Sequence, residues 1–248
     1  MYRVLIMLLF TLTSFVSPKG SFKSTQLKYA RVKEAFQEKG KSMAKLYENK
    51  KIKINNAHIF MRVFKQEDEL ELWAKSITSK KFTRIKTFKI CAKSGTLGPK
   101  SRAGDGQVPE GLYYIDRFNP NSSYHLSLGI NYPNKADKIR AGFYPTGGDI
   151  FIHGECVTIG CMPLTNAYIE ELYIASVEAK ECLQKTIQVE IYPCHLTKDN
   201  ITKIKKQYAK KSDFIKVWNA LEKSYEHFEK NKTPIKYSID AKGNYVFA

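Results

Sequence analysis

The chain has 248 residues, of which 43% are hydrophobic and 26% charged, so it can bury a sizeable core and is not a disordered chain. Its 41 basic and 24 acidic residues give a formal net charge of +17, which favours polyanionic surroundings such as nucleic acid, a membrane surface or an anionic cell wall. The lysines are scattered without a nucleic-acid-binding motif, so a solvated surface explains the charge equally well and we expect no nucleic-acid partner.

Residues 1–20 have the pattern of an export signal. Arg3 precedes an uncharged apolar run from Val4 to Val16, and small residues and a proline follow it. The run is short for a bilayer span, which favours a signal peptide, with an uncleaved anchor as the alternative. We therefore predict an exported protein of the periplasm or cell envelope that touches a membrane only through this segment if it remains uncleaved.

Residues 21–56 are predicted to form a basic N-terminal helical segment. Apolar residues recur at loose helical spacing between Lys23 and Lys50, and Gly40 is expected to end or interrupt the helix. The period then changes to that of strands. Residues 58–64 and 70–76 predict a hairpin around a turn at 65–68, and residues 82–91 predict a third strand.

A loop rich in glycine and proline, residues 94–111, leads into a further predicted strand at 112–116. Beyond the central stretch, Thr165 is expected to cap a helix, and residues 187–194 are expected to form the closing strand. Residues 196–248 predict a helical appendage, with helices at 198–210 and 213–230, the second capped by Ser212, and a terminal hairpin about Lys242 and Gly243.

The stretch from Asp149 to Leu164 carries the strongest chemical pattern. A buried strand delivers His153 at its end, next to Gly154, and Gly160 and Cys161 follow a short polar loop. A base beside a cysteine in a tight turn is the arrangement that a thiolate nucleophile needs. A structural histidine and an unreactive cysteine remain the alternative interpretation.

The odd number of cysteines leaves at least one unpaired in an oxidising compartment. We predict that Cys161 is the reactive thiol, because Glu155 beside Cys156 disfavours a thiolate there. A disulfide between Cys182 and Cys194 is conceivable, although burial explains both. Because the sequence has no C-x-x-C pair, P-loop or zinc motif, we expect no metal and no cofactor. The cysteines are Cys91, Cys156, Cys161, Cys182 and Cys194.

These motifs resemble a known family. His153-Gly154 followed by residues 158–162 (TIGCM) resembles the signature of the L,D-transpeptidase catalytic (YkuD-type) domain family, the cysteine enzymes of bacterial peptidoglycan. The short loop of HGECVTIGC, the run at 124–134 and the aromatic spacing of the C-terminal helices resemble the YafK-like branch. The resemblance implies an α+β fold: a mostly β mixed sandwich over residues 57–195, with one packed helix behind the catalytic loop and the helical C-terminal appendage.

The resemblance also implies roles for the residues of the central motif. Cys161 would be the nucleophile, His153 the proton acceptor and donor, and Gly160 a backbone oxyanion donor. In a polar loop, Arg140 is a candidate to bind a substrate carboxylate, because Pro163 stands where many members carry arginine and a guanidinium matches a carboxylate. Further candidate substrate-binding residues are His125, Tyr124, Gly154 and Thr158.

The implied function is that of a periplasmic cysteine acyltransferase or amidase acting on peptidoglycan stem peptides, with a wall-linked lipoprotein as a further candidate partner. Transpeptidation and hydrolysis both stay open, since the sequence does not choose between an amine and water as acceptor. The alternative is a non-catalytic envelope or cell-wall-binding protein on the same fold, favoured by Pro163 and the high positive charge.

Overall fold

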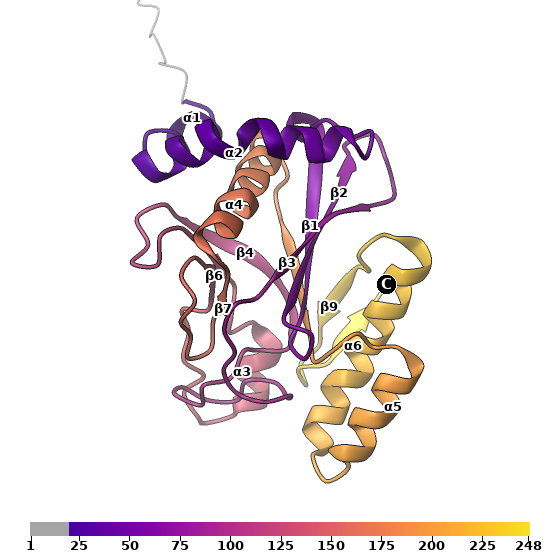
Figure 1. The fold of residues 1–248 in the computed structure, drawn as a ribbon. Coiled ribbons are helices and arrows are strands. Elements are labelled where there is room, and N and C mark those ends of the chain that lie inside the picture. The colour runs from indigo at the N-terminus through magenta and orange to yellow at the C-terminus, as the bar shows by residue number, and fades with distance from the viewer. Residues whose placement is uncertain (1–19) are drawn as a thin grey trace, which may run out of the picture.

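A computed structural model describes residues 20–248 of the chain, which are drawn in colour in Figure 1. Apart from Gly20, the predicted export segment lies outside the described residues. Among residues 20–248, no helix is both long and apolar enough to cross a membrane. The helices of this part are α1 (Phe22–Gln26), α2 (Ala30–Glu48), the 3-10 turn η1 (Ile54–Asn56), α3 (Lys135–Ala141), α4 (Asn166–Glu181), α5 (Lys198–Gln207) and α6 (Ser212–Asn231). Its strands are β1 (Ala57–Phe64), β2 (Glu69–Ser76), β3 (Thr83–Lys89), β4 (Gly111–Asn119), β5 (Ser127–Ile130), β6 (Phe151–His153), β7 (Met162–Pro163), β8 (Gln188–Tyr192), β9 (Tyr237–Ile239) and β10 (Tyr245–Phe247).

The larger sheet is mixed and curled. Its eight strands follow the order β3-β2-β1-β8-β4-β5-β6-β7. β1 pairs with β8 and β6 pairs with β7 in parallel, whereas the other neighbours are antiparallel. Just beyond β3, the N–H of Cys91 donates to the carbonyl of Pro163 in β7 over 3.0 Å, so the two ends of the sheet meet. The predicted α+β class is confirmed.

The predicted hairpin of β1 and β2 is confirmed, with Ala57 opposite Ser76 and Phe64 opposite Glu69. The strand expected at residues 187–194 is present as β8, although it does not lie at an edge of the sheet. β8 is an interior strand between β1 and β4, and its Val189 and Ile191 are fully buried. The backbone groups of β8 are paired on both edges of the strand, with β1 and with β4. Its position inside the sheet explains why it carries buried apolar side chains.

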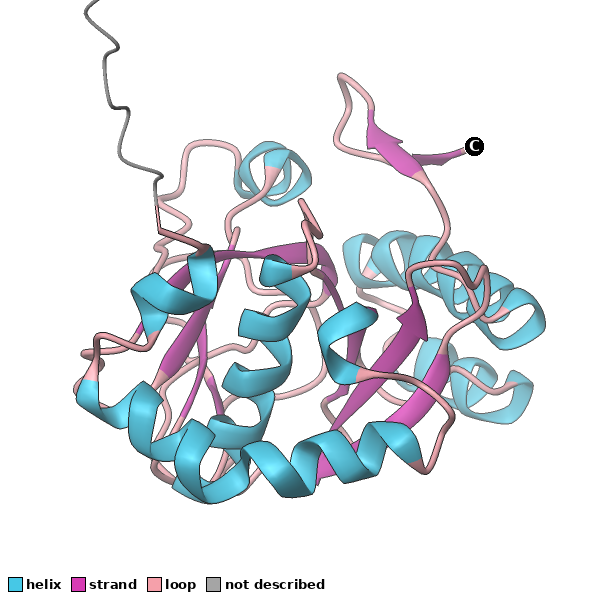
Figure 2. Ribbon diagram, turned by 90° about the horizontal axis from the view of Figure 1, so that it is seen from above, coloured by secondary structure: helices cyan, strands magenta, loops and turns pink. Residues whose placement is uncertain are grey.

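Helices α1, α2 and α4 lie together on one side of the sheet (Figures 1 and 2). α2 continues through Gly40, which contradicts the predicted break. A glycine inside a helix costs about 1 kcal/mol relative to alanine. The buried side chains of α2 offset this cost, since Val32 and Met43 on either side of the glycine are completely buried in the core.

The predicted C-terminal helices and hairpin are present as α5, α6 and the β9–β10 pair. α6 begins at Ser212 itself, after Lys211 and without a side-chain cap, so the predicted capping role of Ser212 is wrong. Trp218 of α6 is fully buried in a cluster that also contains Phe64 of β1 and Leu112 of β4. The C-terminal helices therefore share a core with the strands of the main sheet.

Candidate active site

Two short parallel strands hold the segments that carry the predicted base and nucleophile. β6 pairs with β7 so that Ile152 lies opposite Met162 and His153 opposite Pro163. Ile152 and Met162 are buried, His153 is the last residue of β6, and Cys161 directly precedes β7. In this register Cys161 stands beside Phe151, two residues before His153 along β6.

The thiol of Cys161 lies against the backbone of the strand before His153. The N–H of Phe151 donates to Sγ over 3.4 Å, and Sγ donates to the Asp149 carbonyl over 3.7 Å. Burial raises the pKa of the Cys161 thiol, and the Phe151 N–H opposes this rise only in part. Cys161 is thus held as a neutral thiol, with a backbone donor already directed at the sulfur.

The imidazole of His153 is oriented by the backbone. Its Nδ1 lies 2.5 Å from the carbonyl oxygen of Gly154. Because a carbonyl oxygen can only accept, Nδ1 carries the proton and Nε2 of the neutral ring is an acceptor. Burial lowers the pKa of His153, against the smaller opposing effects of the Gly154 carbonyl and Glu155. The ring of Tyr124 lies 4.7 Å from the His153 ring, centroid to centroid, so this predicted substrate residue stands at the base.

The loop before Cys161 is tightened by Thr158. Its Oγ1 accepts from the N–H groups of Gly160 (3.1 Å) and Cys161 (2.9 Å) and donates to the Cys161 carbonyl (2.9 Å). Gly160 has a φ of 138°, and a Cβ there would stand 3.2 Å from the Gln107 carbonyl, so only glycine fits. In this conformation the N–H of Gly160, the predicted oxyanion donor, is engaged by Thr158.

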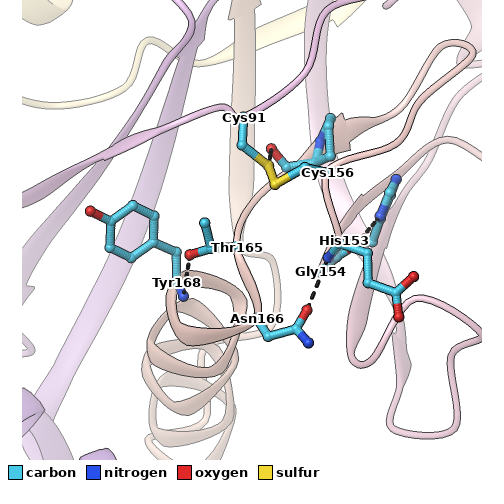
Figure 3. Close-up of a disulfide and its surroundings, with 9 residues drawn as sticks. Cys91, His153, Gly154, Cys156, Thr165, Asn166 and Tyr168 are labelled. Carbon is cyan, nitrogen blue, oxygen red and sulfur yellow. Dashed lines mark hydrogen bonds between the residues drawn. A yellow bond between two sulfur atoms is a disulfide. The ribbon is translucent and has the colours of Figure 1, made fainter.

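The same loop is fastened at its other end by a disulfide that the sequence did not indicate. Figure 3 shows Cys91, just after β3, joined to Cys156. Asn166, the first residue of α4, accepts the N–H of Glu155 through its side-chain oxygen over 3.0 Å. The loop between base and nucleophile is thus tied to the sheet and to the helix predicted to lie behind it. Thr165 caps that helix as expected.

The free thiols among the described residues are those of Cys161, Cys182 and Cys194. The suggested Cys182–Cys194 disulfide is therefore absent from residues 20–248. Cys156 was predicted to be a less reactive thiol, but it has no thiol at all. Burial raises the pKa of Cys194 to about 12, which makes that sulfur inert. Cys161 is the free cysteine that lies at a pocket.

The pocket beside Cys161 has a volume of about 220 Å³. One wall comes from the loop that follows β3, and another comes from the end of β1 and the turn after it. No group of three or more His, Cys, Asp or Glu side chains within residues 20–248 is placed to hold a metal ion. The pocket is lined by Val63, Lys65, Gln66, Asp68, Ile90, residues 92–97, Val108, Cys161 and Met162.

Arg140 is a predicted substrate residue that the structure places elsewhere. It lies in α3 rather than in a polar loop, and its guanidinium donates to the buried carboxylate of Asp137 over 3.1 Å. It lines a different pocket of about 400 Å³ between α3, α6 and the C-terminal hairpin, which does not include Cys161. The error has a local cause, because Asn134 and Asp137 form a capping box that starts a helix in this stretch.

His125 and Gly154 have structural partners. The Nε2 of His125 lies 2.8 Å from a carboxylate oxygen of Glu170 in α4, so the ring is already paired. A Cβ on Gly154 would meet Asn166 Oδ1 at 2.7 Å and the Tyr124 carbonyl at 2.9 Å, so this glycine permits close packing at the end of β6. Of the predicted substrate residues, Tyr124 and Thr158 lie at the base and the nucleophile, whereas His125 and Arg140 are engaged by carboxylates.

Sequence reasoning missed two groups that shape the site. The Phe151 N–H is a backbone group, so no residue type signals its approach to the thiol. Lys100 is buried in an ion pair with Asp105 and lies close enough to lower the pKa of Cys161 slightly. It comes from the Gly/Pro loop, where the pattern indicated only turns.

The structure thus has a curled mixed sheet, a free cysteine at a pocket and a backbone-oriented histidine at the end of the neighbouring strand. The chain matches the family model of the L,D-transpeptidase catalytic domain (YkuD) over residues 49–181. It therefore belongs to that family, which relates it to peptidoglycan. The protein named "Putative L,D-transpeptidase YafK" from Escherichia coli (strain K12) is 34% identical over 245 residues, covering 98% of this chain and 88% of that protein.

Solved structures give more distant likenesses. A crystal structure of the helical cell shape determining protein Pgp2 from Campylobacter jejuni is 21% identical, with a TM-score of 0.45, covering 74% of this chain and 73% of that chain. The crystal structure of Mycobacterium tuberculosis L,D-transpeptidase 1 is 13% identical, with a TM-score of 0.30, covering 54% of this chain and 62% of that one.

Proposed function

We propose that this protein is an exported cysteine-dependent acyltransferase or amidase that acts on peptidoglycan stem peptides through a Cys161 thioester. One observation carries the proposal. Cys161 is a free thiol at a pocket and directly precedes the strand that pairs with the strand of His153. The Nδ1 of His153 is occupied by a carbonyl, so Nε2 remains an acceptor. The family membership and the relative named as an L,D-transpeptidase support the substrate class.

The reaction begins with two neutral groups. Nε2 of His153 removes the proton from Cys161, and the sulfur attacks a carbonyl carbon of the stem peptide. The Phe151 N–H stabilises the thiolate that forms. As the tetrahedral intermediate collapses, imidazolium protonates the departing amine and leaves a thioester. An acceptor amine or water then releases the acyl group as a new amide or as an acid.

Oxyanion stabilisation requires a local rearrangement at Thr158. The N–H groups of Gly160 and Cys161 point to its hydroxyl at rest, so they can bind an oxyanion only when that hydroxyl turns away. A backbone donor that reaches the oxyanion typically lowers an acyl-transfer barrier by about 3 kcal/mol. Exchanging Thr158 Oγ1 for a charged oxyanion would strengthen both hydrogen bonds at the moment when charge develops.

The experiment is direct. Purified protein incubated with disaccharide-tetrapeptides is expected to change them, as read by mass spectrometry, and Cys161→Ala and His153→Ala are each expected to abolish the change. Cys194→Ala is the matched control, since its sulfur is buried away from the pocket. Unaltered substrate with the wild-type protein would refute the enzymatic proposal. In cells, loss of 3→3 crosslinks on Cys161→Ala would identify a transpeptidase, and accumulation of an uncut species would identify a hydrolase.

The second candidate is a non-catalytic envelope or wall-binding protein. It is favoured by one observation, namely that Thr158 occupies both N–H groups near a neutral, half-buried thiol. Binding of intact peptidoglycan that is unchanged by Cys161→Ala, together with no chemical change in the disaccharide-tetrapeptides, would support this candidate.

A further inference from the structure

The C-terminal helices reach the pocket beside Cys161 through one buried carboxylate. Glu110, directly before β4, is completely buried. One of its oxygens accepts from the N–H of Gly98 over 2.7 Å and pairs with Lys65 Nζ over 2.9 Å. The other accepts from the indole N–H of Trp218 in α6 over 2.6 Å. Glu110 therefore joins the pocket side of the domain to the C-terminal appendage.

The pocket side of this network holds the wall segment at residues 94–98. Lys65 Nζ donates to the carbonyls of Gly98 and Val108, each over 2.9 Å. Gly98 thus has its N–H bonded to Glu110 and its carbonyl bonded to Lys65. Because residues 94–97, Val108 and Lys65 itself line the pocket, this pair determines where one wall stands relative to the thiol.

The appendage side fills the space behind the same wall. The ring of Phe214 in α6 lies where a side chain on Gly98 would stand, 2.2 Å from the position of its Cβ. Leu97, which lines the pocket, also packs against the cluster that contains Trp218. The wall is therefore pressed against α6 and hydrogen-bonded to it through Glu110.

We propose that Trp218 and Glu110 are positioning residues for substrate binding, so that the C-terminal appendage is a working part of the active-site pocket. The effect on substrate kinetics that we expect rests on the proposed function. A buried ion pair adds little net stability, whereas a fully satisfied buried network fixes geometry. Loss of the indole N–H would leave the carboxylate short of a donor and release the wall at residues 94–98.

The test compares two tryptophans in the full-length protein. Trp218→Phe removes the N–H donor and keeps an aromatic ring. Trp73→Phe is the matched control, because Trp73 also donates to a buried carboxylate, that of Glu71 over 2.8 Å, at a place that does not line this pocket. Glu110→Gln is the second variant, since it keeps the side-chain size and removes the charge that holds Lys65.

Two readouts are measured on each variant. With disaccharide-tetrapeptides, Trp218→Phe and Glu110→Gln are expected to raise KM by about 5–10-fold with kcat within about threefold, because binding is loosened while Cys161 and His153 are intact. Amide hydrogen exchange of residues 94–98 is expected to accelerate at least tenfold. Trp73→Phe is expected to change neither quantity.

Hydrogen exchange needs no turnover, so the two proposals fail separately. If the wild type does not alter any substrate, the proposed function is wrong, and exchange at residues 94–98 still decides the positioning role. Unchanged exchange in both Trp218→Phe and Glu110→Gln would overturn the inference. Equal acceleration in Trp73→Phe would overturn it as well, as would a loss confined to kcat.

Discussion

At the scale of single residues, burial disfavours the charged forms of both Cys161 and His153. Burial raises the pKa of the thiol and lowers the pKa of the imidazole, so the charged thiolate–imidazolium pair is disfavoured at rest. Under the proposed mechanism, proton transfer therefore belongs to the reaction step, in which the Phe151 N–H supports the developing charge on sulfur. A site of this kind limits adventitious oxidation or alkylation of its thiol.

The pH dependence of Cys161 labelling follows from these directions. Only the thiolate reacts with iodoacetamide, and the raised pKa shifts its appearance to a higher pH than for an ordinary thiol, at about 8.5. We expect the labelling rate, followed by peptide mapping, to rise on the alkaline side without a shoulder at low pH, and to respond little to His153→Ala.

The same peptide in urea-unfolded protein is the control, and its rate should rise at lower pH than in the folded protein. A low-pH shoulder in native protein that disappears in His153→Ala would show instead that the resting pair is ionic.

At the scale of elements, the loop from Gly154 to Gly160 is fastened at several points. The Cys91–Cys156 disulfide ties it to the end of β3, Asn166 ties it to α4, and Thr158 closes its last turn. Cys91 belongs to the segment that precedes the pocket wall at residues 92–97. One covalent bond therefore couples the loop before Cys161 to the pocket wall.

The double variant Cys91→Ser/Cys156→Ser tests this coupling. Removing a disulfide that spans 65 residues is expected to cost about 2–4 kcal/mol of the free energy of unfolding. Turnover should also fall when measured well below the melting temperature, because the loop that positions Cys161 loosens. Urea titration measures the first effect and substrate conversion the second.

Cys182→Ser/Cys194→Ser is the control pair, because these thiols are free and distant in sequence from the loop. Full turnover in the Cys91/Cys156 variant would show that the disulfide stabilises the fold without positioning the nucleophile.

For Arg140 in α3, we predict that substitution lowers the stability of the fold and leaves activity unchanged. Its guanidinium compensates the buried carboxylate of Asp137, whose pKa is raised by burial and lowered in part by Arg140 itself. Arg140→Met should cost about 1–3 kcal/mol in urea titration, because a buried acceptor loses its charged donor.

The kcat/KM of folded Arg140→Met should equal that of the wild type, since the residue lines a different pocket. A large loss of kcat/KM with unchanged stability would instead indicate that Arg140 binds substrate.

At the scale of the whole molecule, residues 196–248 complete the core of the domain. Phe64, Leu112 and Tyr192 belong to the main sheet, are at most 1% exposed and pack in the cluster that contains Trp218. Fully burying a large apolar side chain contributes about 1.5–3 kcal/mol, and a typical domain is stable by only about 5–15 kcal/mol. The appendage and the sheet therefore depend on each other.

A chain that ends after His195 is expected to lose its cooperative thermal transition, because those three side chains become exposed together. Circular dichroism and size-exclusion chromatography measure the transition and the aggregation that should accompany its loss. Deletion of only the β9–β10 hairpin should be milder, as Trp218 stays covered. A soluble truncated protein with the wild-type transition would make residues 196–248 a separate domain.

Much of the local structure was predictable because its causes are local. Alternation in residues 57–76 marks the β1–β2 hairpin, Thr165 marks the start of α4, and the glycine pattern around His153 and Cys161 marks a strand end and a tight turn. Backbone propensity and the periodicity of apolar side chains act over a few residues, so they can be recognised from a single sequence. The motif that resembles the YkuD family is local in the same sense.

The tertiary structure alone decided which distant groups meet. Cys91 pairs with Cys156 because the curled sheet brings the end of β3 to the loop before β7, and no spacing in the sequence encodes that approach. Asp137 accepts a hydrogen bond from Arg140, and Thr158 accepts one from the N–H of Gly160. Both contacts depend on how the folded chain places these groups. Residue type indicated the chemistry available at Cys161 and His153, whereas burial and the competing partners, which arise only on folding, determined which groups remain free to perform it.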